Sequence, residues 1–331
     1  AKKQSKRIFQ EAKKTLDKCL IVCYNKRAIR EAMASPIDYI KRMETPMTKL
    51  DKRRKYYLIL DCETATLPYA AKFPADMKKN IAIAKPLIYD LGWQIVDIHG
   101  KVYKRASYLI SEIFSVPAVF NTAYYASKRP IYLERLKNKE ITLTDWNTAI
   151  AELIEDLDAV EAVGAYNSMF DYKKALPFTD LYISKLYSPD FFDWEAYQND
   201  RCEAIAHGSK PHSQKEFEPD VFRFHGKTYP LFDLWGLSCE HLLNNPDYKQ
   251  MCYDNEWKTA SGKYYPTNAE KAYAYCFQQE DFEESHTAIE DAIIESMLFA
   301  LITKKTKHKF ERGIEYFPYK KLGRFDEDWG L

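Results

Sequence analysis

The stretch "YYLILDCETATLP", residues 56 to 68, constrains the fold most, because an apolar run ends in two carboxylates, Asp61 and Glu63. Its first five residues are aliphatic or aromatic, which is typical of a buried strand. Side chains alternate faces along a strand, so the two acids point one way and Cys62 the other, with acid Cα atoms roughly 6.6 Å apart. Like charges at that spacing repel unless protons or cations neutralise them. The alternative is a frayed strand end whose acids lie in water.

Composition favours one large cytoplasmic domain. The chain has 331 residues, of which 46% are hydrophobic and 15% aromatic, enough for a substantial core. No apolar run approaches the ~20 residues of a membrane helix. The first residues, "AKKQSKRIFQEAKK", do not resemble a secretory leader. Seven cysteines without paired spacing predict reduced thiols. We therefore expect a cytoplasmic location, which would be the host cytoplasm if the protein is viral.

Charge is divided unevenly along the chain. Residues 1–55 hold 17 Lys and Arg against 6 Asp and Glu, whereas the remainder holds 32 against 42. Helical spacing in residues 5–32 predicts that residues 1–50 form a basic helical arm. Such an arm could steer phosphate backbones or dock an acidic partner. It could equally be a solvated helix without a ligand.

The order of the expected elements predicts an α/β fold with a mixed sheet flanked by helices. After the first strand, residues 87–100 and 101–110 are expected to form a hairpin that turns at His99-Gly100. An amphipathic helix is predicted over 145–160, followed by a buried strand at 162–166. A further helix is expected to begin after Asn167, which would be its N-cap residue. More helices are expected over residues 229–245, 267–282 and 288–304. Residues 178–228, with few periodic runs, are interpreted as a loop-rich insertion that either shapes an active-site rim or decorates the surface.

Two more acidic positions complete a pattern. Asp171 falls in the first turn of the helix that Asn167 would cap, just beyond a strand end. His286 and Asp291 are five residues apart and cannot share a helix face. Thr287 begins a capping-box pattern that would start the helix there, leaving His286 in the preceding loop and Asp291 one turn inside. A fixed acid and an imidazole could then approach one spot, which suits a metal ligand and a general base.

Taken together, these motifs resemble the DEDDh (DnaQ-like) 3′→5′ exonucleases of the ribonuclease H-like superfamily. The resemblance is carried by Asp61-Cys-Glu63-Thr64, by Asn167 through Phe170-Asp171, and by His286-x4-Asp291. It covers residues 55–175 and 270–303, and leaves the arm, the insertion and a basic, aromatic tail at 303–331 outside. It implies one exonuclease domain over residues 51–331 with a ribonuclease H-like sheet.

The resemblance also implies roles for individual residues. Asp61, Glu63, Asp171 and Asp291 would hold two divalent cations, Mg²⁺ or Mn²⁺, and His286 would take the proton from the attacking water. Hard oxygen ligands suit these ions, and a pair of them neutralises charge on both the attacking and leaving oxygens of a phosphodiester. Four residues would contact the substrate: Thr64, Leu67, Asn167 and Phe170. The chain departs from the family pattern at Thr66, where many members have Gly, and at Tyr166, where many have His.

The expected activity is metal-dependent removal of nucleoside monophosphates from single-stranded 3′ ends, with DNA favoured over RNA. A polymerase or another replication protein could bind through the basic arm. Two alternatives remain open: a catalytically silent nucleic-acid-binding or assembly protein with the same fold, and a ribonuclease of the same family. No residue of the motifs decisively recognises the 2′-hydroxyl, the group that distinguishes RNA from DNA.

Several other patterns have competing interpretations. A structural zinc site is conceivable among the residues listed here: Cys202, His207, His212, His225, Cys239, His241 and Cys252. Scattered buried cysteines and surface histidines explain them as well, because the paired spacing of zinc ligands is missing. For Cys19 and Cys23, one helical turn apart, core packing is a better explanation than metal binding. Asp233 could approach the site from a neighbouring element, although a cap or turn role is favoured. The aromatic tail could stack on single strands or pack on its own domain.

Overall fold

The computed structural model describes residues 50–51, 53–66, 86–186 and 218–330. The predicted arm (1–50), except Leu50, lies outside the described residues. So do Leu67 and residues 187–217 of the predicted insertion.

The described chain is built around a seven-stranded mixed sheet with the strand order β4-β3-β2-β1-β5-β7-β6. The strands are β1 (Tyr56–Thr66), β2 (Pro86–Asp97), β3 (Val102–Ile110), β4 (Thr142–Thr144), β5 (Ala162–Ala165), β6 (Val221–Phe224) and β7 (Lys227–Asp233). β1 pairs antiparallel with β2 and parallel with β5, and β5 pairs parallel with β7. The α/β prediction is confirmed, and the sheet is compatible with a ribonuclease H-like arrangement.

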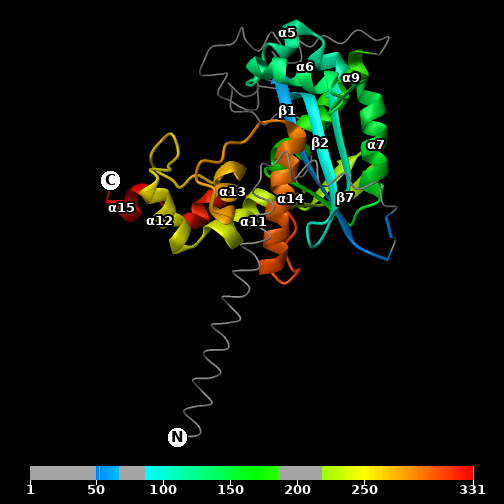
Figure 1. Cartoon of the computed structure of the whole chain (residues 1–331). Helices are drawn as coiled ribbons and strands as arrows, with labels where there is room; N and C mark the ends of the chain where they lie inside the picture. Colours follow the sequence, from blue (N-terminus) through cyan, green and yellow to red (C-terminus); the bar gives the residue numbers. More distant parts are fainter. Residues whose placement is uncertain (1–49, 52, 67–85, 187–217, 331) are drawn as a thin grey trace, which may run out of the picture. The chain divides into compact units, whose positions relative to one another are not determined.

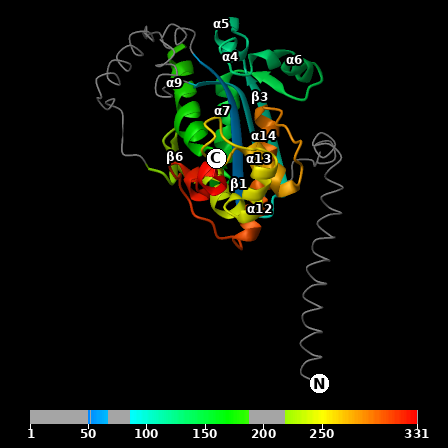
Figure 2. The same cartoon turned by 90° about the vertical axis from the view of Figure 1, so that its left-hand side faces the viewer.

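Helices cover both faces of this sheet (Figure 1). The helices of the described ranges are α4 (Ser111–Phe114), α5 (Pro117–Phe120), η2 (Ala126–Lys128), α6 (Arg129–Lys137), α7 (Trp146–Asp158), α8 (Ser168–Phe170), η3 (Asp171–Ala175), α9 (Leu176–Leu186), α11 (Leu234–Ser238), η4 (Cys239–Leu243), α12 (Pro246–Asp254), α13 (Ala269–Phe277), α14 (Ala288–Lys305), η5 (Pro318–Leu322) and α15 (Phe325–Trp329). Seen from two sides, α14 lies along one face, and α7 and α9 lie on the other (Figures 1 and 2).

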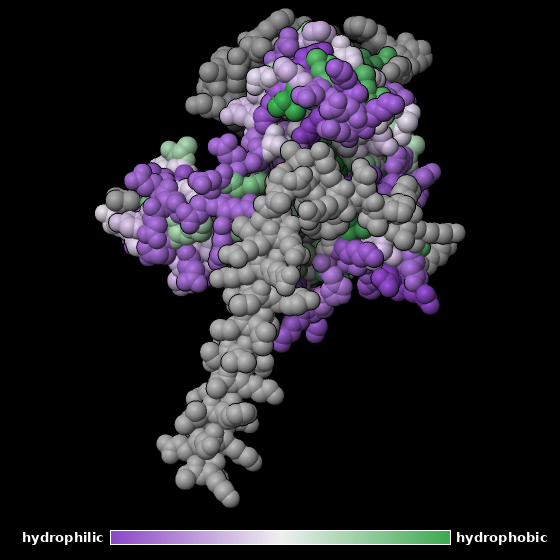
Figure 3. Space-filling view, viewed as in Figure 1, coloured by the Kyte–Doolittle hydropathy of each residue, from purple (hydrophilic) through white to green (hydrophobic). Residues whose placement is uncertain are grey.

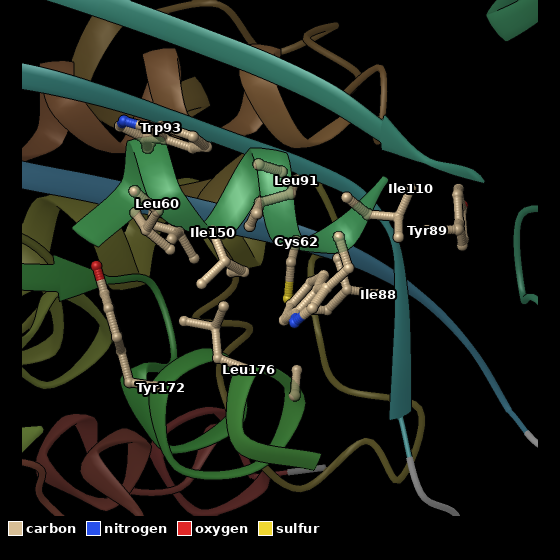
Figure 4. Close-up of a cluster of buried hydrophobic side chains, with 14 of the residues drawn as sticks. Leu60, Cys62, Ile88, Tyr89, Leu91, Trp93, Ile110, Ile150, Tyr172 and Leu176 are labelled. Atoms are coloured by element: carbon tan, nitrogen blue, oxygen red, sulfur yellow. The ribbon is translucent and has the colours of Figure 1, made fainter. Parts of the chain in front are cut away.

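Strand β1 divides its side chains between these two faces, as the alternation predicts. Leu58, Leu60 and Cys62 join the core on the side of α7 and α9. Figure 4 shows Leu60 and Cys62 near Ile150 and Leu176. Tyr57 and Ile59 belong to the second core, with α11 and α14. Asp61 and Glu63 continue this second row, so both carboxylates face the side that α14 covers.

The central hairpin is confirmed. β2 and β3 pair antiparallel, and the Gly100 N–H donates to the Asp97 carbonyl at 2.9 Å in the turn between them. Gly92, in the middle of β2, permits a close approach by α14. A Cβ atom at this position would come within 2.4 Å of the backbone nitrogen of Ile289. The absence of a side chain at Gly92 therefore lets the first turn of α14 contact the sheet directly.

The predicted helices at 145–160, 267–282 and 288–304 correspond to α7, α13 and α14. The helix predicted over 229–245 is wrong in its first part. Residues up to Asp233 belong to β7, and α11 starts at Leu234. A short apolar run such as "YPLFDLWGL" does not separate a buried strand from a helix by periodicity, and pairing with β5 decides it.

The predicted loop-rich insertion at 178–228 is also wrong at both ends. Helix α9 continues to Leu186, and the described residues beyond 217 contribute strand β6. Both were missed because each element gains its stability from tertiary packing rather than from a periodic pattern of its own.

The tail packs on its own domain. Gly313 forms a bridge with Phe232 of β7, and Leu322 and Phe325 are buried in the second core. Tyr316 and Phe317 remain exposed. Figure 3 shows a largely hydrophilic surface over α12 and α15. Of the helices in the described ranges, none is both long and apolar enough to span a bilayer.

We predict that Gly92→Ala lowers the free energy of unfolding by about 1–3 kcal/mol, because the new methyl group overlaps the backbone of α14. Chemical denaturation measures the change. Gly236→Ala in α11 is the matched control, since the nearest atom to its Cβ would be at 3.4 Å and Ala favours a helix. Equal stability of the two variants would contradict the close approach of α14 to β2.

Candidate active site

The three predicted motifs meet at one cavity of about 510 Å³. It is lined by Asp61, Cys62, Glu63, Tyr125, Tyr166, Asn167, Phe170, Asp171, Trp235, Thr267, Asn268, Ala269, Glu284, His286, Asp291 and Glu295. All five predicted catalytic residues belong to this lining. Residues separated by more than 200 positions along the chain thus share one space.

Asp61 and Glu63 lie in the second half of β1, the central strand of the sheet. Asp61 lies opposite Gly92 and Glu63 opposite Asp90 on β2. The register then shifts between Glu63 and Thr64, which marks a β-bulge. A bulge turns the strand locally and is common beside functional sites.

Asp171 enters the site from the end of β5. A tight turn leads from Ala165 into α8, and the Ser168 hydroxyl donates to the Phe232 carbonyl at 2.7 Å. The Cys62 thiol, which points to the opposite face from Asp61, donates to Asp171 Oδ1 at 3.0 Å. Cys62 therefore fixes one oxygen of the carboxylate that follows the turn.

The predicted cap of this turn is only partly right. Asn167 occupies the N-cap position, but its side chain makes no capping hydrogen bond, and its φ is 143°. Asp233 accepts instead from the Ser168 N–H at 2.9 Å and from the Gly236 N–H at 3.0 Å, where it caps α11. The cap role proposed for Asp233 is confirmed. The strained backbone at Asn167 directs that residue into the cavity lining.

Two side chains from other elements, Asp90 of β2 and Arg135 of α6, anchor the start of α14. The Ala288 N–H donates to Asp90 Oδ2 at 3.0 Å. Arg135 of α6 donates to Thr287 Oγ1 at 3.0 Å and to Glu290 Oε1 at 2.7 Å. Thr287 is the N-cap residue, as predicted, but its hydroxyl bonds to the Glu290 carboxylate instead of to a backbone N–H. The buried carboxylate of Asp90 takes the place of the expected side-chain cap.

His286 lies in the loop before α14, as predicted, with a left-handed φ of 50°. Its Nδ1 atom is 3.7 Å from Glu284 Oε2. Burial lowers the pKa of His286, the cation of Lys128 lowers it further, and Glu270 opposes both. The neutral imidazole is therefore favoured, which is the form that accepts a proton or binds a metal.

Two groups of potential ligands in the described residues share His286. Glu270, Glu284 and His286 form one, and Glu63, His286 and Asp291 form the other, a tight group with one ligand atom of each within 4.8 Å of the others. Asp291 Oδ1 is buried without a hydrogen-bond partner. A buried carboxylate oxygen left this way is costly unless a cation or proton satisfies it. The donor set of oxygens with one imidazole therefore fits a divalent cation. Asp61 and Asp171 line the same cavity without belonging to this tight group.

Burial and mutual repulsion raise the pKa values of the clustered acids. Burial raises the pKa of Glu63 to about 9, with Asp90 adding to the effect. It raises the pKa of Asp171 to about 7, against the lowering effect of the Cys62 hydrogen bond. The pKa values of Asp61 and Asp291 also lie well above the ordinary range, first through burial and then through neighbouring carboxylates. Cations that entered this cluster would displace protons.

The sequence motifs missed two acids of the cavity. Glu295 is buried and accepts from the Tyr166 N–H at 3.1 Å, which ties α14 to the end of β5. It lies four residues after Asp291 in an otherwise apolar stretch, and that helical spacing was a signal that could have found it. Glu284, in contrast, lies in an irregular loop, where no periodicity points to the cavity.

The predicted substrate contacts divide into three groups. Asn167 and Phe170 line the cavity. Thr64 lies on β1 but not among the described lining residues, and Leu67 is outside the described residues, so their roles stay predictions. Tyr166, a departure from the family pattern, also lines the cavity and donates through its hydroxyl to the Thr267 carbonyl at 2.7 Å. Thr66, the other departure, donates its N–H to Thr122 Oγ1 at 2.8 Å.

The alternative zinc site receives no support within the described ranges. Cys239 and Cys252 are buried free thiols, and His225 contacts Asp180 at 3.2 Å. The two groups of potential metal ligands found in the described part of the chain contain no cysteine. Cys19, Cys23, Cys202, His207 and His212 lie outside the described residues.

No protein-family model, curated protein or solved structure matches this chain. The arguments for function therefore come from the cavity and from the motifs that line it.

We predict that the protein without divalent cations becomes less stable as pH rises from about 5 to 9. Burial raises the folded-state pKa of Glu63 to about 9 from its ordinary value of 4.5. Between these values the unfolded chain releases protons that the folded protein retains, so ionisation favours unfolding. The melting temperature in EDTA at several pH values measures the effect, and Glu63→Gln should reduce the slope.

Mn²⁺ or Mg²⁺ should raise the melting temperature more at pH 8.5 than at pH 5.5. At a concentration of about 100 times Kd, binding contributes about 2.7 kcal/mol. The exposed-surface variant Asp254→Asn, on α12, is the control and should respond to cations as the unaltered protein does. A cation effect that is independent of pH would contradict binding to the clustered acids.

Proposed function

We propose that this protein is a metal-dependent 3′→5′ exonuclease that acts on single-stranded nucleic-acid ends, with DNA favoured, and releases nucleoside monophosphates. The observation that carries the proposal is the convergence of Asp61, Glu63, Asp171, His286 and Asp291 on one cavity. These are the positions at which the sequence resembles the DEDDh exonucleases. The mixed sheet, with β1 between β2 and β5, is compatible with their ribonuclease H-like fold.

The clustered acids suit phosphodiester hydrolysis. Glu63 and Asp291 would hold one cation, with Asp61 and Asp171 available to a second on the same cavity wall. Bound Mg²⁺ or Mn²⁺ would supply charge neutralisation at the attacking and leaving oxygens and would activate water. Without such cations the acids would repel the phosphate, so the arrangement favours a polyanionic substrate only when it is loaded with metal.

His286 has the properties of a general base. It lies beside Glu63 and Asp291, and burial together with Lys128 favours its neutral form. The Glu284 carboxylate, 3.7 Å from Nδ1, is placed to stabilise the imidazolium that forms when His286 accepts a proton. The same position would allow His286 to be a metal ligand, and kinetics distinguish the two roles.

The walls of the cavity favour a nucleotide over a small anion. Tyr125, Tyr166, Phe170 and Trp235 line the same space as the acids. Aromatic side chains stack on bases with about 1–3 kcal/mol per base and little sequence preference. A volume of about 510 Å³ is within the range of cavities that hold small organic ligands. The terminal base could therefore contact the aromatic walls while its phosphodiester lies at the acids.

We expect that Asp61→Asn reduces turnover at least about 10³-fold, a loss of ~4 kcal/mol of transition-state stabilisation, because a metal ligand loses its charge. The measurement uses 5′-end-labelled single-stranded DNA and RNA of matched sequence with Mn²⁺ or Mg²⁺. A 3′→5′ exonuclease produces a ladder of shortening products. Asp254→Asn on α12 should keep the activity of the unaltered protein.

The same experiment separates the alternatives. Faster digestion of RNA than of DNA would favour the ribonuclease. Binding of both strands without products, across metals and substrates, would favour a catalytically silent nucleic-acid-binding or assembly protein. The partner proposed for the arm at residues 1–50, a polymerase or another replication protein, and the cytoplasmic location are separate expectations that digestion does not address.

We also predict that His286→Ala lowers kcat about 10²–10⁴-fold while metal affinity falls much less, as expected for a general base. Asp291→Asn is the comparison variant and should weaken both. Isothermal titration with Mn²⁺ measures affinity, and steady-state digestion measures turnover. An equal loss of both quantities in His286→Ala would identify His286 as a metal ligand instead.

A further inference from the structure

The turn between α5 and α6 forms a wall beside His286 that no sequence motif predicts. The Tyr125 ring is stacked on the His286 imidazole, with centroids 4.3 Å apart and an interplanar angle of 13°. Tyr125 also lines the cavity together with the acids. A parallel stack at this distance restricts the plane in which the imidazole can lie.

Lys128 holds the same two segments together. Its ammonium lies 4.6 Å from the centroid of the Tyr125 ring and donates to the carbonyl of Ser285, the residue before His286. One cation therefore contacts the face of the supporting ring and the backbone of the supported loop. The Lys128–Ser285 hydrogen bond and the Tyr125–His286 stack therefore connect the turn to residues 285–286 at two points.

The turn has a rigid foundation in the core. Phe120 of α5 is buried and lies edge-on to Tyr89 of β2, with ring centroids 5.0 Å apart. Arg129, at the start of α6, lies 4.9 Å from the ring centroids of both Phe114 and Phe120. Rings fixed in this way give Tyr125 a stable base, which a mobile surface loop would not.

His286 needs such external support. It occupies the left-handed region with φ 50°, and it belongs to an irregular segment between α13 and α14. A non-glycine residue in this conformation is held by its surroundings rather than by its own preference. Glu284 approaches one ring atom, and Tyr125 covers a ring face.

We propose that Tyr125 is a positioning residue for His286, and that Lys128 clamps the loop that carries this histidine. The inference rests on the proposed function, because it names the group that orients the base of that site. Tyr125 acts through the imidazole: its ring keeps a His286 nitrogen within reach of Glu63 and Asp291, and it supplies no proton of its own.

Three variants test this inference. Tyr125→Leu removes the stacked ring and should reduce kcat about 10–100-fold with KM changed less than about threefold, because a misplaced base slows the chemical step more than binding. Tyr125→Phe keeps the ring and should restore kcat to within about twofold. Leu133→Ala on α6 is the nearby control, since Leu133 is 51% exposed, and should keep the original kcat.

A nuclear magnetic resonance measurement gives a readout that is independent of turnover. The His286 ring protons, assigned by comparison with His286→Gln, should carry an upfield ring-current shift in the unaltered protein and in Tyr125→Phe. The shift should be lost in Tyr125→Leu. Lys128→Met should reduce it partly, because the loop loses its clamp, while Lys128→Arg should retain more of it.

Unchanged kcat and an unchanged His286 spectrum in Tyr125→Leu would overturn the inference. So would an equal loss of kcat in Tyr125→Leu and Tyr125→Phe, which would assign the effect to the hydroxyl. If the unaltered protein digests neither DNA nor RNA, the proposed function fails. The ring-current shift then still decides whether Tyr125 holds His286.

Discussion

Mutual repulsion among buried carboxylates is the constraint on which the rest of this structure depends. Burial raises the pKa of Asp61, and the carboxylates of Glu295, Asp171 and Asp291 raise it further. Burial likewise raises the pKa of Glu295, with Asp171 and Asp291 adding to the effect. Such a cluster persists in a folded protein only when protons or cations neutralise it. The surrounding fold offsets this electrostatic repulsion, because each of these acids lies on an element that packs into one of the two hydrophobic cores. The clustering of these acids therefore depends on the packing of the whole domain and not on any one motif.

Close packing of α14 on the sheet brings the acids together. Gly92 removes the side chain that would separate β2 from the first turn of α14. Asp90 and Arg135 then fix where that helix begins, and Asp291 follows one turn later. On the other side, Asp233 and Cys62 hold the turn that carries Asp171. Polar groups outside the proposed set of metal ligands therefore set the geometry of the candidate site.

Much of the fold was predictable because its signals are local. Alternation in β1 separated Asp61 from Cys62, and the apolar period of residues 146–158 defined α7. The prediction failed at β7, where a short apolar run is compatible with either a strand or a helix, and at β6, which gains its stability from tertiary packing. It also failed for two side-chain caps, because buried carboxylates from distant elements, Asp233 and Asp90, replaced the local Asn167 and Thr287. Local sequence patterns identify capping residues only among near neighbours, whereas in the folded protein a residue distant in sequence can supply the cap.

The sequence by itself determined which residues could do the chemistry: two acids on one face of the first strand, an acid just beyond a second strand, and a histidine and an acid at a loop-to-helix junction. These follow from backbone periodicity and capping preference, which act within a few residues. Only the tertiary structure decided that Glu63, His286 and Asp291 approach within 4.8 Å, that Glu295 adds a buried charge, and that Tyr125 lies against His286. Contacts of that kind depend on how the helices pack against the twisted sheet, and no short-range sequence pattern specifies that packing.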